Sequence, residues 1–278
     1  MKRIELVKIK DCKNLLKTTP EKKHYNKIIS EDCIFTKDGK DVGIYVKVDS
    51  SKLNDIRSAA TSTKLSKSSR TRGLPTQSSI FGSLPRIARR NDFCRYSSHT
   101  KKELKNTNIL FSFMNELIDI YKKYLPNQYN RDIKIIKESV VEDYALNKDS
   151  PFLTCNINVN HAIKYHRDSG NFKKNLSNVL ILRDGIIGGE LVFPEYGFAL
   201  SQEDGYLSIF DGQTEIHGVM PIYQIKENPY RASIVYYSLE QMKHCYPYKM
   251  EVERLQKVST ERAVKRAKNL DPTKKTKN

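Results

Sequence analysis

The sequence predicts an α+β fold in which two helices precede a series of short strands. Apolar residues recur at helical spacing from Asn108 to Leu125, directly before Pro126, and a second helix is predicted from Asn130 to Tyr144. From Phe152 onward the pattern changes to short apolar runs bounded by Gly, Pro, Asn and Asp. Short strands at such regular spacing indicate an all-β barrel or sandwich. We therefore expect a helical part followed by a β barrel or sandwich.

The chain before these helices is predicted to hold one hairpin and one long loop. Residues 31–50 read as two short strands around Lys37-Asp38-Gly39-Lys40, where Asp-Gly is a turn signal. Residues 58–83 are rich in Ser, Thr, Gly and basic residues and show little periodicity. This composition predicts a loop or a lid.

The C-terminal half supplies the predicted strands. Their sequences are FLTCNINVN, NVLILRDG, GELVFPE, GYLSIFDG, HGVMPIYQI and ASIVYYSLE. The tail from Lys249 on is predicted to be a basic helix that frays after Asp271-Pro272. A solvated helix and a helix in contact with nucleic acid are both open for it.

The positive charge of the chain is large and unevenly placed. The formal net charge is +17 in 278 residues, which favours a polyanionic partner such as nucleic acid over mere solubility. From Lys52 to Lys102 there are 12 basic residues against two acidic ones. From Lys249 to Asn278 there are 10 against 4. The basic character is therefore local.

Cysteine usage and apolar runs bear on the compartment. Five cysteines are odd in number, widely spread and never in C-x-x-C spacing, which argues against a disulfide framework and a structural zinc site. The N-terminus lacks an apolar core of signal-peptide length, and no run approaches the roughly 20 apolar residues of a membrane span. We expect a soluble intracellular protein without a membrane partner, in the nucleus if eukaryotic and otherwise in the cytoplasm.

Two histidines and an aspartate have the spacing of a metal site. In a strand, residues i and i+2 share a face, so His166 and Asp168 of the segment YHRDSGN can bind one ion. His217, 51 residues after His166 at the start of another β segment, is the candidate third ligand. Two imidazoles and one carboxylate form the facial triad of non-haem Fe(II) oxygenases, which leaves three coordination positions open.

A candidate co-substrate site follows the triad in the sequence. Arg231 and Ser233, at the start of the run IVYY, place a guanidinium and a hydroxyl on one strand face. A guanidinium pairs bidentately with a carboxylate, which suits the far end of 2-oxoglutarate. Each residue alone has an ordinary reading as a surface histidine, a turn residue or a salt-bridge partner. Their order and spacing within β sequence favour the catalytic interpretation.

The stretch from about Ile80 to Met242 resembles the TET/JBP family of 2-oxoglutarate- and Fe(II)-dependent dioxygenases. The resemblance rests on YHRDSGNFK, GGELVFPEYGFAL, LSIFDGQTEIHGV and YRASIVYYSLEQM, preceded by IFGSLPRIARRNDFCR. It implies a double-stranded β-helix (jelly-roll or cupin-like) core with helices outside, an iron site of His166, Asp168 and His217, and a 2-oxoglutarate site at Arg231 and Ser233. Members of this family hydroxylate the methyl group of 5-methylcytosine or thymine in nucleic acid.

The resemblance also implies substrate contacts. Asn171 and Tyr237 stand where family members approach the flipped base, and stacking on an aromatic ring suits such a base. Family members that act on 5-methylcytosine tend to have a His where this chain has Leu239, which leaves thymine open. In the basic segment RIARRNDFCRY, Arg90 or Asn91 is a candidate base contact.

These inferences define the expected protein. Residues 1–75 are expected to be an N-terminal extension with the hairpin and the basic loop, 76–246 the dioxygenase domain, and 247–278 the basic C-terminal helix and tail. We expect a monomer that uses Fe(II), 2-oxoglutarate and O2 to hydroxylate thymine or 5-methylcytosine in DNA, with RNA as the alternative. Two other functions stay open: a dioxygenase of the same fold acting on a protein side chain or small molecule, and a non-catalytic nucleic-acid-binding module.

Overall fold

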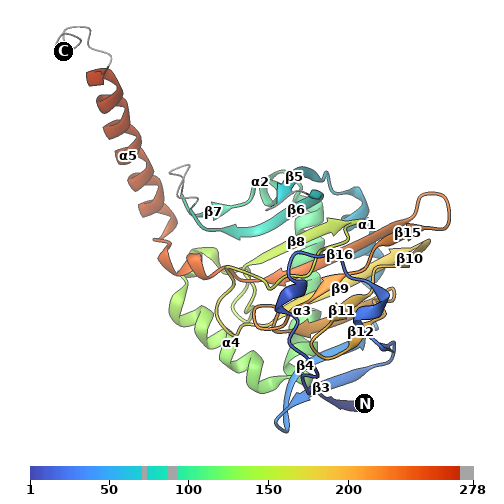
Figure 1. Ribbon diagram of the computed structural model, residues 1–278. Helices are drawn as coiled ribbons and strands as arrows, with labels where there is room; N and C mark the ends of the chain where they lie inside the picture. Colours follow the sequence, from blue (N-terminus) through green and yellow to red (C-terminus); the bar gives the residue numbers. More distant parts are fainter. Residues whose placement is uncertain (71–73, 87–92, 270–278) are drawn as a thin grey trace, which may run out of the picture.

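Two β-sheets lie face to face, with helices on the outer face of the larger one (Figure 1). The computed structural model describes residues 1–70, 74–86 and 93–269. The helices are α1 Leu53–Ser62, α2 Ser98–Lys102, α3 Leu104–Tyr124, α4 Pro126–Ser139 and α5 Tyr248–Asn269, with short 3-10 turns η1 Lys13–Leu15, η2 Lys22–His24, η4 Glu142–Tyr144 and η5 Glu240–His244. The α+β prediction is confirmed.

The larger sheet joins strands from both ends of the chain. Within the described residues its order is β1-β3-β4-β13-β9-β16-β8-β6-β5, with β7 also paired to β6. The strands are β1 Lys2–Glu5, β3 Cys33–Lys37, β4 Lys40–Lys47, β5 Ser66–Arg70, β6 Leu74–Leu84, β7 Arg95–Tyr96, β8 Thr154–Val159, β9 Ser177–Asp184, β13 Tyr206–Phe210 and β16 Tyr230–Tyr237. The first strands therefore complete a sheet whose centre comes from the C-terminal half.

The smaller sheet has the order β14-β11-β12-β2, and β10 pairs separately with β15. The strands are β2 Lys27–Ile29, β10 Ile186–Gly188, β11 Leu191–Phe193, β12 Phe198–Leu200, β14 Gly218–Val219 and β15 Ile222–Gln224. Phe193 and Phe198 of this sheet pack with Phe35 and Phe210 of the larger sheet. This aromatic layer holds the two sheets together.

Side-chain alternation sorts the central strands into two faces. Leu180 and Leu182 of β9 join Leu110 and Phe113 of α3 in the largest apolar cluster, so this face of the sheet is covered by helix. In β16, the alternate residues Arg231, Ser233 and Tyr237 lie on the opposite face, toward the smaller sheet. Polar and ionisable groups are thereby collected between the sheets.

Most predicted elements are present. The helix from Asn108 to Leu125 corresponds to α3, and the six β segments correspond to β8, β9, β11, β13, β14 with β15, and β16. The second predicted helix begins earlier, at Pro126, because proline is tolerated in the first turn of a helix, and it ends at Ser139 before the turn η4. The hairpin is β3 and β4, and both Asp38 and Gly39 at its tip have positive φ.

The predicted loop over residues 58–83 is wrong. This stretch contains the end of α1 and the strands β5 and β6. Strand β6 pairs with β8, where Ile80 lies opposite Asn156 and Phe81 opposite Cys155. Backbone hydrogen bonds to a neighbouring strand stabilise this Ser- and Thr-rich segment. Such bonds do not depend on the type of side chain, so the segment can be a strand without alternating apolar residues in its sequence.

One pair of cysteines also departs from expectation. Cys94 and Cys245 form a disulfide across 151 residues, with a Cα–Cα distance of 5.8 Å. The fold brings them together, so their spacing along the chain carried no signal. Cys12, Cys33 and Cys155 are free and buried.

The tail prediction of a helix is confirmed by α5, which extends away from the two sheets (Figure 1). Among the described residues, no helix is both long and apolar enough to cross a membrane. The predicted compartment and the division of the chain at residues 75 and 246 stay predictions.

The first turn of α5 contains a fully buried carboxylate. Glu251 is 0% exposed and accepts hydrogen bonds from Arg86 Nε and from the backbone N–H groups of Cys94 and Tyr246. Burial raises the pKa of Glu251, but these hydrogen bonds outweigh burial and lower it. The group is therefore held as an anion whose main charged partner is Arg86.

We expect Arg86→Ala to lower the free energy of unfolding by about 3 kcal/mol, because a buried carboxylate loses its partner. The control is Arg3→Ala, which breaks the exposed ion pair with Asp41 at 3.1 Å and should cost much less, because solvent screens an exposed pair. Urea denaturation followed by circular dichroism measures both. Equal losses in the two variants would contradict the role given to Arg86.

Candidate metal centre

The segment that carries His166 and Asp168 follows β8 and is not a regular strand. His166 forms an isolated antiparallel bridge to His217, and residues 167–169 have no assigned secondary structure. The expectation of a strand is therefore wrong, although the two side chains still converge. Asp168 is oriented by its own backbone N–H, which donates to the carbonyl oxygen of Gly212 at 2.7 Å.

His217 reaches the site from the turn between β13 and β14. The carboxylate of Asp211 accepts hydrogen bonds from the backbone N–H groups of Gln213 and Thr214, which closes this turn. The chain then passes through His217, which exchanges two backbone hydrogen bonds with His166 at 2.9 and 3.0 Å. Two segments 51 residues apart in the sequence are joined at the two histidines themselves.

The three side chains converge on one point. Asp168 Oδ1 lies 3.5 Å from His166 Nε2 and 3.8 Å from His217 Nε2, and the two imidazole centroids are 4.3 Å apart. One ligand atom from each residue lies within 4.8 Å of the others. The structure thus brings together all three residues of the predicted triad.

Backbone carbonyls select the histidine tautomers. His166 Nδ1 is 2.8 Å from the carbonyl oxygen of Lys164, and His217 Nδ1 is 2.9 Å from that of Glu215. A carbonyl oxygen only accepts, so each Nδ1 carries hydrogen and each Nε2 is left free to bind a metal. Both histidines are therefore prepared as Nε2 ligands.

The electrostatics of the three groups suit a divalent cation. Burial raises the pKa of Asp168, but the hydrogen bond from His166 and the charges of both imidazoles outweigh it and lower the pKa to about 2. Burial lowers the pKa of His217 to about 4, and the charge of His166 acts in the same direction. Burial also lowers the pKa of His166, yet the nearby Asp168 carboxylate outweighs it and the net shift is upward. At neutral pH the site holds one carboxylate anion and a neutral His217, the states in which these groups bind metals.

Arg231 is the second unusual group between the sheets. It is 3% exposed, and its Nε has no hydrogen-bond partner. Burial lowers its pKa to about 10, helped by the charge of Arg183 and opposed by Glu190. Gly189 makes room for it, because a Cβ at that position would lie 2.8 Å from Arg231 Nε. A buried guanidinium with an unpaired N–H fits an anionic ligand.

Ser233 lies one step along the same strand face. Its Oγ accepts a hydrogen bond from Asn158 Nδ2 at 3.3 Å, and Asn158 Oδ1 accepts one from Asn156 Nδ2 at 3.0 Å. Ser233 and Asn158 are opposite each other in the β16–β8 register. The polar side chains of Arg231 and Ser233 on β16 therefore continue into Asn158 and Asn156 on β8.

The predicted substrate residues lie at the metal end of β16. Tyr237 is half-buried at the end of this strand, next to the end of β9 that begins with Ser177. Asn171 donates from Nδ2 to Ser177 Oγ at 3.3 Å, and it forms an isolated bridge with Leu239. Both residues are thus near the triad. Arg90 and Asn91 lie outside the described residues.

The chain matches a family of oxygenases. The family model Tet_JBP, the oxygenase domain of the 2OGFeDO superfamily, matches residues 85–240, more than half of the chain. The chain belongs to this family. As a Tet_JBP member it is a 2-oxoglutarate- and Fe(II)-dependent dioxygenase, as the sequence predicted.

Two solved structures are similar to this chain to different degrees. NgTET1 in complex with 5mC DNA has a TM-score of 0.60 at 13% identity, covering 81% of this chain and 82% of that chain. A 2OG-Fe(II) oxygenase family oxidoreductase from Burkholderia pseudomallei has a TM-score of 0.42 at 13% identity, covering 70% of this chain and 84% of that one. No match was found among functionally curated proteins. The likeness to NgTET1 concerns the fold and confirms the predicted double-stranded β-helix core.

The residues present fit the cofactors of this Tet_JBP domain. Two imidazole nitrogens and one carboxylate are the donor set of a non-haem Fe(II) site with open positions. The unpaired guanidinium of Arg231 fits a carboxylate of 2-oxoglutarate. Both groups can be held by side chains that face the space between the sheets.

Sequence reasoning missed the residues that support the triad. Ser177, at the start of β9, donates a hydrogen bond to Asp168 Oδ2 at 3.3 Å. A Cβ at Gly212 would lie 2.2 Å from the same oxygen. Asp211-Gly212 is visible in the sequence only as a turn signal, and Ser177 gives no signal at all.

We expect Gly212→Ala to weaken Fe(II) binding by about 10- to 100-fold, the usual cost of disturbing the support of a metal ligand, because the added methyl displaces the Asp168 carboxylate. Anaerobic titration with Fe(II) measures the affinity. Gly39→Ala is the control: no atom lies within 4 Å of its added methyl, so metal affinity should not change. Unchanged Fe(II) affinity in Gly212→Ala would contradict the close approach.

Proposed function

We propose that this dioxygenase hydroxylates the methyl group of a pyrimidine base, thymine or 5-methylcytosine, in DNA. One observation supports the catalytic part above all: a buried Arg231 with an unpaired Nε lies on the strand face that leads to the convergent triad. Membership of the Tet_JBP family and the charge of +17 support a nucleic-acid substrate. We expect the protein to act as a monomer, with DNA preferred to RNA.

The triad holds the metal and leaves part of its coordination sphere open. His166 and His217 offer Nε2 because backbone carbonyls occupy both Nδ1 groups. Asp168 offers Oδ1, while its Oδ2 accepts from Ser177. Iron, 2-oxoglutarate and O2 together supply the oxidising power for hydroxylating a C–H bond, and the protein contributes binding and orientation.

Arg231 and Ser233 receive the far carboxylate of 2-oxoglutarate in this proposal. The guanidinium and the hydroxyl share a strand face, and both are at least nine-tenths buried. In such surroundings water competes poorly for the guanidinium, so a charged pair with a carboxylate is strong. Asn158 holds the Ser233 hydroxyl from the opposite strand.

We expect Arg231→Met to raise the dissociation constant for 2-oxoglutarate by about 100-fold, because roughly two charge-assisted hydrogen bonds are lost. Calorimetric titration of the anaerobic Fe(II) protein measures it. Arg57→Met is the control, since that guanidinium is already paired with Asp204 at 2.9 Å and is expected to leave 2-oxoglutarate affinity unchanged. Wild-type affinity in Arg231→Met would refute the assignment.

The base is proposed to lie between Tyr237 and Asn171. Tyr237 offers a ring for stacking, and Asn171 offers an amide at the metal end of β16. Leu239, bridged to Asn171, presents no hydrogen-bonding side chain toward a base edge. This keeps thymine as a substrate beside 5-methylcytosine. Arg90 and Asn91 remain proposed contacts to the base from the sequence alone.

The substrate assignment is tested on DNA that contains both thymine and 5-methylcytosine. With Fe(II) and 2-oxoglutarate, the wild-type protein should yield hydroxymethylated nucleosides, measured by mass spectrometry, and succinate. His166→Ala should yield neither, because the triad loses one of its two imidazoles. His244→Ala, an exposed histidine outside the triad, should behave as wild type.

The outcomes separate the alternatives. Succinate without a hydroxymethylated nucleoside would reject a pyrimidine base as the substrate and favour a protein side chain or a small molecule. Binding of DNA without succinate would reject catalysis and leave a nucleic-acid-binding module. Hydroxymethylated nucleoside from His166→Ala would refute the triad.

A further inference from the structure

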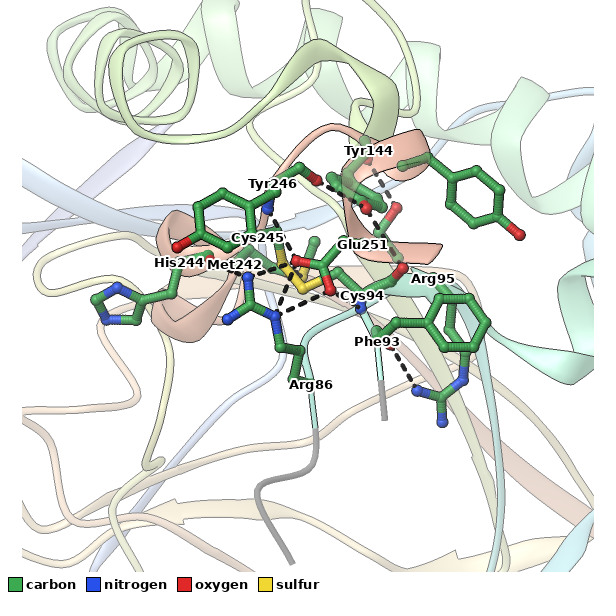
Figure 2. The surroundings of a disulfide bond; sticks show 12 residues. Arg86, Phe93, Cys94, Arg95, Tyr144, Met242, His244, Cys245, Tyr246 and Glu251 are labelled. Carbon is green, nitrogen blue, oxygen red and sulfur yellow. Dashed lines mark hydrogen bonds and ion pairs between the residues drawn. A yellow bond between two sulfur atoms is a disulfide. The ribbon is translucent and has the colours of Figure 1, made fainter. Parts of the chain in front are cut away.

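The Cys94–Cys245 disulfide lies inside an apolar cluster that borders the proposed base site. Figure 2 shows it between the start of β7 and the end of η5, with Met242 and Tyr144 beside it. Cys94 is 1% exposed and Cys245 6%. The cluster contains the two cysteines, Ile136, Tyr144, Leu153, Phe172 and Met242, with Leu239 packed against it.

Phe172 and Leu239 connect this cluster to the metal site. Phe172 follows Asn171, and its backbone N–H donates to Ser238 at 3.0 Å, while Asn171 bridges to Leu239. The carbonyl oxygen of Phe172 also accepts from Gln213 Nε2 at 2.9 Å, in the turn that leads to His217. Phe172 and Leu239 thus form a wall between the apolar cluster and the proposed base site. The side chains of the cluster behind this wall determine the positions of Asn171 and Leu239.

Polar contacts fasten the same two chain segments beside the disulfide. Glu251 accepts from Arg86 and from the backbone of both Cys94 and Tyr246, as the dashed lines in Figure 2 show. The single hydroxyl hydrogen of Tyr144 is shared between the carbonyl oxygens of Cys94 and Tyr246, which lie 3.3 and 3.1 Å from Oη. The disulfide is the covalent member of this set, and it joins segments that lie 151 residues apart.

We propose that the Cys94–Cys245 disulfide is a positioning element for the nucleic-acid substrate. It holds η5 and the start of β7 against Phe172 and Leu239, and so fixes the wall that carries Asn171. This inference rests on the proposed function, because it assigns the wall to the base. The proposed 2-oxoglutarate residues Arg231 and Ser233 are not members of the cluster, so we expect 2-oxoglutarate affinity not to depend on the disulfide.

The chemistry is a two-electron reduction of the disulfide. A phosphine supplies the two electrons: the bond between the two Sγ atoms breaks, water supplies the two protons that make each sulfur a thiol, and the phosphine takes the oxygen of that water and becomes a phosphine oxide. The reduced cysteines remain buried but are no longer held at bonding distance. The wall then loses its covalent fastening while the triad keeps its own backbone bridge.

The experiment compares oxidised and reduced wild-type protein on methylated duplex DNA. A phosphine reductant is used and removed anaerobically, and peptide mapping counts free thiols before and after. Reduction should raise KM for DNA and lower kcat/KM about 10- to 100-fold, the scale expected for a misplacement of about 1 Å. The affinities for Fe(II) and 2-oxoglutarate should stay unchanged.

Two variants give the controls. Cys94→Ala/Cys245→Ala should behave as reduced wild type and should not respond to the phosphine. Met242→Leu changes packing in the same cluster at nearly constant volume, keeps the disulfide, and should remain sensitive to reduction. If the double variant does not fold, wild-type protein is titrated with the phosphine instead. Activity on DNA is then compared at each step, and circular dichroism checks that the reduced protein stays folded.

Several results would overturn the proposal. One is free Cys94 and Cys245 in protein purified without reductant. Another is equal KM for DNA in oxidised and reduced protein. A third is a loss of Fe(II) or 2-oxoglutarate affinity that parallels the DNA effect, which would mean that the disulfide only stabilises the fold as a whole. Failure of the proposed function would look different, since neither form would then yield a hydroxymethylated nucleoside.

Discussion

The backbone bridge between His166 and His217 is the constraint on which the site depends. Two hydrogen bonds of 2.9 and 3.0 Å join residues from separate segments at the positions of the two imidazoles. Each such bond contributes only about 1 kcal/mol net, but together they fix the relative direction of two side chains. Asp168 is then positioned from the same segment as His166, by its hydrogen bond to Gly212. The triad is thus a property of backbone geometry more than of the side chains alone.

The larger sheet gives this bridge a rigid base. Strand β13, which leads into the turn before His217, lies between β4 from the N-terminal region and β9. Strand β9 begins with Ser177, which supports Asp168, and pairs with β16, which carries Arg231. The candidate metal ligands, their support and the proposed co-substrate residues are therefore positioned by neighbouring strands and by the segments that connect them. Helix α3 covers the opposite face of these strands and leaves the inner face to polar groups.

Arg231 shows why the inner face serves a ligand. A charged side chain is buried at a cost, and proteins usually offset that cost with a partner charge. Besides burial, the charge of Arg183 disfavours the protonated guanidinium, and the charge of Glu190 favours it. Gly189 makes the space, and Asn160 holds the backbone of Arg231 with its side-chain oxygen at 2.7 Å. The arrangement retains a buried cation that fits an anionic ligand.

Local sequence patterns predicted most of the elements and the candidate site residues. The apolar period of α3, the turn signal of the hairpin and the bounded apolar runs are short-range effects, so each is readable from the chain. The spacing of His166, Asp168, His217 and Arg231 made them candidates, because metal and carboxylate chemistry restricts the residue types that can serve it. The strand predicted at His166 was wrong, because an isolated bridge leaves no alternation.

Tertiary structure decided whatever depends on partners distant in the sequence. The pairing of Ser- and Thr-rich β6 with β8, the disulfide between Cys94 and Cys245, and the buried ion pair of Arg86 with Glu251 join segments separated by up to 165 residues. The close approach of Gly212 to Asp168 and of Gly189 to Arg231 is equally invisible in the sequence. Contacts of this kind depend on how strands and loops pack in three dimensions, and neither residue type nor spacing encodes that packing locally.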